Sequence, residues 1–217
     1  MMRALLFMLL GLPGMIQAQQ AGGGFEIPRL ALKAHILPLF NPFKTAADLV
    51  ADIRLAPAFS VDLGAGRFLH SRFYAEEAGE SYTGFRLRGG FKYFMPTSGK
   101  NALHLGLEAR YHDIRHVKVA DALRQGGQYV ETIQYDRNVR AAGVAFRMGF
   151  QGYFGKNDRF VWEPFCGLGF SQYNISVDVP ADAELLAGGR LFDLEYPVGE
   201  SPGLHFLFGV HLGWCLW

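Results

Sequence analysis

The sequence ends in GLHFLFGVHLGWCLW, residues 203–217, where large apolar residues occupy every second position. Between Phe206, Phe208 and Val210 lie smaller or polar residues, among them Gly209 and His211. Successive side chains of a β-strand point to opposite faces, whereas a helix needs apolar residues three and four positions apart. The ending therefore predicts a strand with one large apolar face and one small or polar face.

Seven further runs of the chain show the same alternation. The run at about residues 82–95 is typical, because FRLRGGFKY alternates large apolar residues with basic residues or glycine. The other six runs lie at about 29–40, 48–55, 58–74, 101–117, 129–154 and 159–177. With the closing stretch, these runs predict eight strands.

Short and long connections between these runs alternate along the chain. The short ones lie near residues 56–58 and at PTSGK and GKND, which are rich in turn formers. The long ones are AEEAGES, a polar segment near 118–128 and residues 179–202, where ADAELLAGG suggests a helical turn. NPFKTAA, after the first run, is the exception because it is fairly short. Transmembrane barrels sort short periplasmic turns and longer external loops in this way, whereas a β-sandwich has no reason to do so.

The N-terminus resembles an export signal. MMR supplies a positive charge, ALLFMLLGLPGMI is the apolar core, and Ile16-Gln17-Ala18 suits cleavage before Gln19. We expect a signal peptide at 1–18, a flexible periplasmic lead at 19–28 and the barrel at 29–217. No later run of 18 apolar residues predicts a transmembrane helix, so an exported chain of this kind is either soluble or a membrane barrel.

Charged residues share one face of the predicted strands. An eight-stranded interior is so narrow that charged side chains must alternate with glycine, and glycines are frequent on this same face. A lipid-facing charge would cost about 2–4 kcal/mol at the bilayer midplane. A lipocalin-like soluble barrel would instead place the glycine-rich face outside. We therefore predict an interior polar network of Lys33, Asp52, Arg54, Asp62, Arg86, Arg88, Lys92, Glu108, Arg110, Arg147 and Glu163.

Together these patterns predict an all-β fold, an eight-stranded antiparallel transmembrane β-barrel with short periplasmic turns and longer external loops. Aromatic residues near the strand ends, including Tyr82 and Phe94, predict two interfacial girdles. The formal net charge of +1, with both signs spread along the chain, indicates no nucleic-acid surface.

The order of four segments resembles a known kind of protein. LKAHILPLF, LVADIRLAPAFSVDLGAG, FRLRGGFKYFMP and VWEPFCGLGFSQYNI, with the aromatic C-terminus, resemble small OmpA-type outer-membrane barrels. More narrowly, they resemble a domain-of-unknown-function family of such barrels from Gram-negative outer membranes. The resemblance spans about residues 30–217 and implies localisation in the cell outer membrane.

The resemblance also implies a role for the last strand. Such barrels end in a strand that the barrel assembly machinery recognises, after periplasmic chaperones have delivered the chain. Here this C-terminal insertion strand comprises Phe206, Phe208, Val210, Leu212, Trp214, Leu216 and Trp217. Trp217 is out of phase with Leu216, so either the strand ends at Leu216 or a bulge intervenes. The implied partners are outer-membrane lipid and this machinery, and we expect a monomer whose external ligand the sequence does not identify.

No residue pattern predicts a catalytic, cofactor or metal site. His70 and Ser71 are adjacent, so as strand residues they point to opposite faces and cannot form a nucleophile–base pair. His112 and His116 would lie about 13 Å apart on a strand, too far to share a metal. His35 could lie beside a histidine of the last strand across the closing seam, but no carboxylate or cysteine is clearly in the same layer.

The two cysteines are expected on adjacent strands. Cys166 and Cys215 fall in opposite face registers, which disfavours a disulfide, although the register near Trp217 leaves their pairing open.

Three classes of function remain open. The first is a non-enzymatic barrel with a plugged polar interior and a structural or surface-interaction role through its external loops. The second is a narrow channel for small solutes or anions, and the third is a lipid-modifying outer-membrane enzyme. The interior arginines are compatible with a structural ion-pair network, which we favour, or with an anion path.

Overall fold

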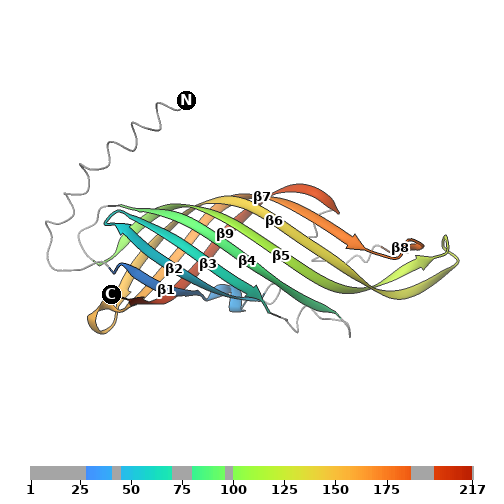
Figure 1. Ribbon diagram of the computed structural model, residues 1–217, viewed down its shortest axis with the longest axis horizontal. Helices are drawn as coiled ribbons and strands as arrows, with labels where there is room; N and C mark the ends of the chain where they lie inside the picture. The colour runs from blue at the N-terminus through green and yellow to red at the C-terminus, as the bar shows by residue number, and fades with distance from the viewer. Residues whose placement is uncertain (1–27, 41–44, 70–79, 96–99, 187–197, 217) are drawn as a thin grey trace, which may run out of the picture.

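Eight antiparallel strands close into a ring in the computed structural model, which describes residues 28–40, 45–69, 80–95, 100–186 and 198–216 (Figure 1). The ring strands are β1 (Leu30–His35), β2 (Ala46–Ala56), β3 (Phe59–Phe68), β4 (Ser81–Phe94), β5 (Ala102–Arg124), β6 (Tyr129–Phe154), β7 (Phe160–Asp178) and β9 (Gly199–Leu216). The remaining elements are the short strand β8 (Ala183–Leu185) and the 3-10 helices η2 (Leu37–Phe40) and η3 (Lys156–Asp158).

The first and last strands close the ring. Sequential strands pair from β1 to β7, β7 pairs with β9, and β9 pairs with β1. At this seam Leu30 is opposite Leu216 and His35 is opposite His211. Because each strand of the ring has two hydrogen-bonded neighbours, the ring itself has no free edge. The predicted all-β, eight-stranded antiparallel barrel is confirmed.

Several strand boundaries differ from the sequence expectation, most clearly those of β1 and β5. β1 ends at His35, short of the predicted 29–40, and η2 follows it. Pro38 lies in η2 and lacks the amide hydrogen that a continuing strand would use. β5 runs on to Arg124 and pairs with β6 from Tyr129, so residues 118–128 are mostly hairpin rather than the predicted loop.

The long β5–β6 hairpin projects beyond the other strands and ends in a tight turn. We call residues 118–135 of this hairpin, together with β8, the arm (Figure 1). β8 pairs with Ala122–Arg124, so the helical turn predicted there is wrong for residues 183–185, while 187–189 lie outside the described residues. Arg124 joins the parts of the arm, since it lies 3.1 Å from both Glu131 and Asp182.

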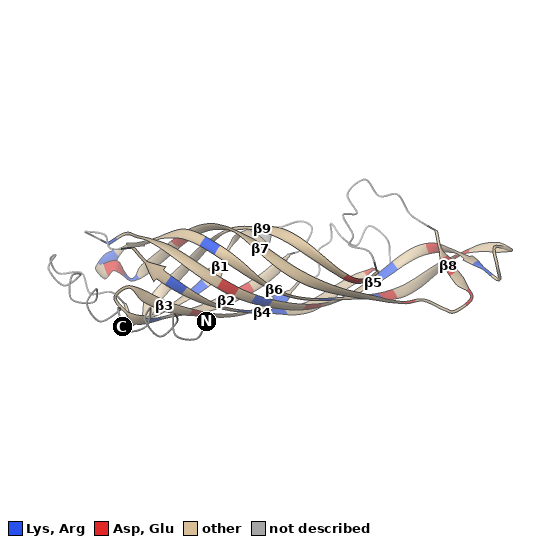
Figure 2. Cartoon of the chain, turned by 90° about the horizontal axis from the view of Figure 1, so that it is seen from above, with Lys and Arg blue, Asp and Glu red and all other residues tan. Residues whose placement is uncertain are grey.

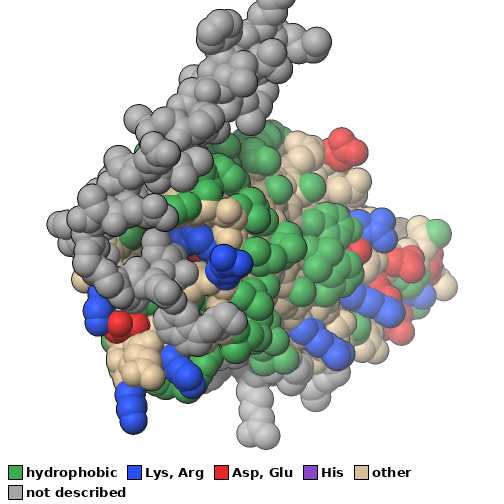
Figure 3. All heavy atoms as spheres, turned by 60° about the vertical axis from the view of Figure 1, so that its left-hand side comes forward, with side chains coloured by type: hydrophobic (Ala, Val, Ile, Leu, Met, Phe, Trp, Pro, Cys, Tyr) green, Lys and Arg blue, Asp and Glu red, His purple; other side chains and the backbone are tan. Residues whose placement is uncertain are grey.

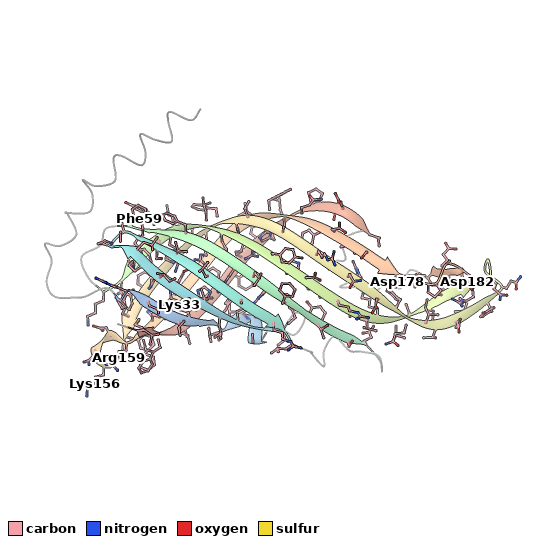
Figure 4. The ribbon with its side chains drawn as sticks, viewed as in Figure 1. Lys33, Phe59, Lys156, Arg159, Asp178 and Asp182 are labelled. Carbon is pink, nitrogen blue, oxygen red and sulfur yellow. The ribbon has the colours of Figure 1, made fainter. Side chains whose placement is uncertain are left out.

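The two ends of the barrel differ. Figure 4 places Phe59, Lys156 and Arg159 at one end, where Pro57 and Ala58 alone link β2 to β3. The arm lies at the other end, marked by Asp178 and Asp182. We call these the turn end and the arm end. Across the described segments, no helix has the length and hydrophobicity needed to cross a membrane.

Apolar side chains cover the outside of the barrel between these ends. In Figure 3 they form a continuous patch in the middle of the visible face, and charged side chains gather to either side of it. Leu107 is 65% exposed and Phe206 is 82% exposed. Tyr82 and Phe94, which we expected in exterior girdles, are instead buried inside, as their register with the interior residues of β4 requires.

Candidate functional site

Buried charges fill the middle of the barrel interior. Lys33 of β1 forms ion pairs with Asp52 of β2 and Glu163 of β7. The Lys92 Nζ atom, from β4, lies 2.8 Å from Asp52 Oδ2 and 3.1 Å from Glu163 Oε1. It also lies 2.9 Å from Asp62 Oδ1 of β3. Two ammonium groups and three carboxylates from five strands therefore share one buried layer.

Arg147 of β6 extends this layer. Its guanidinium donates to Asp62 and, from Nη1 at 3.0 Å, to Glu108 Oε2 on β5. Only 1% of Arg147 is exposed. A guanidinium that holds two carboxylates fixes both in direction as well as distance. We call the following set the central cluster: Lys33, Asp52, Asp62, Lys92, Glu108, Arg147 and Glu163.

Two histidines that the predicted network does not include, His104 and His211, lie against the central cluster. His104 Nε2 lies 3.1 Å from Glu163 Oε1, and His211 Nδ1 lies 3.6 Å from Glu163 Oε2. His104 shares the face register of Glu108, a signal that could have identified it. Asp48, also missed, lies on the same face of β2 as Asp52.

His35 and His211 form the cross-strand pair that the sequence analysis considered, with ring centroids 5.0 Å apart. Our expectation that no carboxylate shares their layer is wrong, because Asp48 Oδ2 lies 3.3 Å from His35 Nδ1, and Glu163 is close to His211. Within the described ranges, however, no three His, Cys, Asp or Glu side chains are placed to hold a metal ion.

Glycines opposite the long polar side chains make the interior wide enough for them. A Cβ atom at Gly64 would lie 2.7 Å from the Arg88 side chain, and one at Gly213 would lie 2.7 Å from Lys33 Cγ. A Cβ atom at Gly149 would lie 2.6 Å from His104 Nε2. The alternation of charge and glycine seen in the sequence is therefore a packing requirement of a narrow barrel.

Aromatic and apolar side chains pack inside the barrel near the turn end. Arg54 lies there, with its guanidinium carbon 3.5 Å from the ring centroid of Phe94 and its Nη2 atom 3.4 Å from the Tyr153 hydroxyl. Ala31, Val161 and Cys215 form a buried apolar group packed with Tyr153. Arg54, predicted as part of the interior network, thus lies apart from the central cluster.

A cavity of about 580 Å³ lies on the arm side of the central cluster. Arg86, Arg88 and Arg110 line it together with Asp48 and Glu108. Arg86 pairs with Asp48, and Arg110 Nη2 donates to Glu108 Oε1 at 2.7 Å. Arg88 Nη2 lies 2.7 Å from His211 Nε2. All the predicted network residues therefore face the interior, and the structure divides them among the turn end, the central cluster and this cavity.

The other predicted residues are placed as follows. His112 and His116 both face the interior, where His112 lies against Tyr173 and His116 against Tyr82. Cys166 is exposed and Cys215 is buried, and both are free thiols.

Three expectations lie outside the described residues: the signal peptide at 1–18, the lead at 19–28 except for its last residue, and the pair His70–Ser71. Trp217 lies outside them as well. The rest of the predicted insertion strand lies on the exterior face of β9: Phe206, Phe208, Val210, Leu212, Trp214 and Leu216.

Comparisons with known proteins add little to this geometry. No family model and no curated protein matches the chain. Among solved structures, the crystal structure of Acinetobacter baumannii CarO is similar, with 11% sequence identity and a TM-score of 0.37. The match covers 88% of this chain and 98% of that one. The hydrogen-bonded ring of this chain itself carries the fold assignment.

Proposed function

We propose that this protein is a monomeric, non-enzymatic outer-membrane β-barrel with a plugged interior, which presents its arm at the cell surface as an interaction element. The observation that carries the proposal is the inverted polarity of the barrel. Charged side chains are buried inside, and large apolar side chains are exposed outside. A water-soluble protein rarely exposes so large a continuous apolar surface, whereas lipid stabilises it.

The apolar exterior has the extent that a membrane barrel needs. Every strand of the ring contributes at least one exposed large apolar residue: Leu32, Leu49, Leu63, Leu87, Leu107, Val144, Leu168 and Phe206. On β4 the apolar exterior positions run from Phe85 to Tyr93, nine residues along the strand. A tilted transmembrane β-strand needs about 9–11 residues.

The central cluster supports the plugged interior. Each of the strands β1 to β7 contributes one of its side chains. On the remaining ring strand, β9, Gly213 lies against Lys33 and His211 lies near Glu163. At the level of the cluster, side chains fill the narrow interior of the eight-stranded barrel, and paired charges hold them in one arrangement. The plug supports a structural or surface role over transport.

The arm supports the interaction role. Charges of both signs continue along it beyond the apolar exterior (Figure 2). Ion pairs on it, such as Arg124 Nε to Glu131 Oε2 at 3.1 Å, suit an aqueous environment. β8 pairs with β5 and stiffens the arm, and a rigid element far from the bilayer is suited to contact a partner outside the cell.

A narrow anion channel is the second candidate, and one observation favours it. The interior carries more basic than acidic side chains among the predicted network residues, and the cavity beside the central cluster is lined by three arginines. Passage of an ion would require the central cluster to open. The cluster pairs Lys33, Lys92 and Arg147 with carboxylates, so the closed form is favoured.

Surface labelling of engineered cysteines tests the proposed topology. Gln128→Cys lies in the turn at the tip of the arm, and Lys156→Cys lies in the turn between β6 and β7 at the opposite end. A membrane-impermeant maleimide applied to intact cells should label the first variant. It should label the second only after the outer membrane is permeabilised.

The unmodified chain is the control for Cys166 and Cys215. Equal labelling of both variants in intact cells, or labelling of Lys156→Cys alone, would contradict the proposed orientation.

A further inference from the structure

The cavity on the arm side of the central cluster has the properties of a ligand site. Its volume of about 580 Å³ lies within the range of about 300–1,000 Å³ typical of pockets for small organic molecules. Three basic side chains enter it from two strands, Arg86 and Arg88 of β4 and Arg110 of β5. Such convergence of charge in a half-enclosed space needs either acidic partners or a bound anion.

The acidic partners are too few. Asp48 pairs with Arg86, and Glu108 pairs with both Arg110 and Arg147. Among the residues that the structure describes, Arg88 has no carboxylate within ion-pair distance. Three guanidinium groups and two carboxylates leave one positive charge in the lining.

The Arg88 side chain is held in place with part of its hydrogen-bonding capacity unused. Its Nη2 atom is 2.7 Å from His211 Nε2, an atom that must accept this hydrogen bond because guanidinium groups only donate. Among the described residues, its buried Nε atom has no hydrogen-bond partner, and the same holds for the buried Nε atom of Arg110. Gly64 provides the space along which Arg88 extends.

The rest of the lining is largely apolar. Phe165 and Leu207 pack together on the β7–β9 side, and Phe68 and Ile114 pack together nearer the arm. The other titratable residues in the lining are His35, Tyr111, His112, Tyr173 and His205. A ligand that matches this lining has one negatively charged end and an apolar body.

We propose that this cavity binds a small organic anion, a carboxylate or phosphate, whose charged end lies against Arg88 and Arg110 and whose apolar body lies against Phe165 and Leu207. The inference goes beyond the proposed function, because it assigns a ligand to the interior and holds whatever the arm contacts. A bound anion supplies the charge that the lining lacks.

Calorimetric titration of the purified full-length barrel in detergent tests this site. The probes are benzoate and phenyl phosphate as the two kinds of anion, and benzamide as a neutral molecule of the shape of benzoate. At least one anion should bind, and benzamide should not. Arg88→Gln should weaken anion binding about tenfold or more, since it removes a charged hydrogen-bonding partner.

Arg54→Gln is the matched control, because Arg54 is an interior arginine at the turn end and does not line the cavity. It should leave anion affinity unchanged. Equal binding of benzamide and benzoate, absence of binding by both anions, or an unchanged affinity in Arg88→Gln would each overturn the proposal. The comparison of benzoate with benzamide uses the unmodified protein, so it tests anion binding even if a variant does not fold.

Discussion

Lys33 and Glu163 form a buried ion pair across the closing seam of the barrel, although 130 positions separate them in the sequence. Lys33 belongs to β1 and Glu163 to β7, and β9 lies between these two strands. Lys33 is opposite Gly213 of β9, and Glu163 is opposite His211. The side chain of Lys33 therefore reaches over a glycine to meet its partner, which links the first, seventh and last strands in one contact.

This relationship makes Gly213 sensitive to substitution. Gly213→Ala would place a Cβ atom 2.7 Å from Lys33 Cγ and in conflict with the backbone of β1. Overpacking of this kind costs about 1–3 kcal/mol, and we expect the free energy of unfolding in detergent to fall by that amount. Urea titration of the refolded barrel measures it.

Gly89→Ala is the control for this prediction. A Cβ atom there would find its nearest neighbour at 3.8 Å, on the Leu63 side chain. An equal loss of stability in the two variants would show that the seam contact is not the cause.

Glu163 should be a strong determinant of stability. Glu163→Gln leaves Lys33 and Lys92 with fewer carboxylates in a layer where Glu163 itself is fully buried. Breaking a buried ion pair by removing one partner costs about 3–5 kcal/mol. Denaturant titration in micelles should show a loss of this order.

An exposed glutamate provides the comparison. Glu131→Gln removes one of the two acidic partners of Arg124 on the arm, where water screens the pair, and should leave stability unchanged. If Glu163→Gln were as stable as Glu131→Gln, the central cluster would not hold the interior together.

The sequence predicts the local features of this barrel but not the contacts between residues that are far apart in the chain. The face of each predicted network residue followed from a period of two, because alternation is a local property of a strand. Its partner did not follow, since Lys33 meets Glu163 only after the ring has closed. The β5 half of the arm was also missed, because VADALR carries polar residues on both faces and the alternation disappears there, whereas its partner strand lies within the predicted run at about 129–154. Tyr82 and Phe94 were misplaced because their type suggested an interface, although their register already indicated the interior.

The last strand should be required for assembly, and the arm should not. Deleting residues 208–217 removes every β9 residue that pairs with β1, so the ring cannot close. We expect this truncated chain to be degraded in the periplasm, which immunoblotting of cell fractions would show.

Shortening the arm is the matched deletion. Val119 and Gln134 are opposite each other, so replacing residues 119–134 with Asn-Gly keeps Lys118 in register with Tyr135. This chain should assemble at normal membrane levels. Normal levels of the C-terminal truncation as well would contradict the role of β9 in closing the barrel.

The plugged interior predicts little ion flow. The central cluster blocks the middle of the lumen with paired charges, so the purified protein in planar bilayers should show no steady conductance, or only rare small openings. A stable, large, anion-selective conductance would contradict the plugged interior and favour the channel alternative.

The central claim is that this chain forms a closed barrel in the outer membrane. The measurement that tests it most directly is gel mobility of the protein recovered from the outer-membrane fraction, with and without heating, because a closed barrel resists detergent until it is heated. We predict that the protein is found in this fraction and migrates faster unheated than boiled. Recovery in the soluble periplasmic fraction, with a mobility that heating does not change, would contradict it.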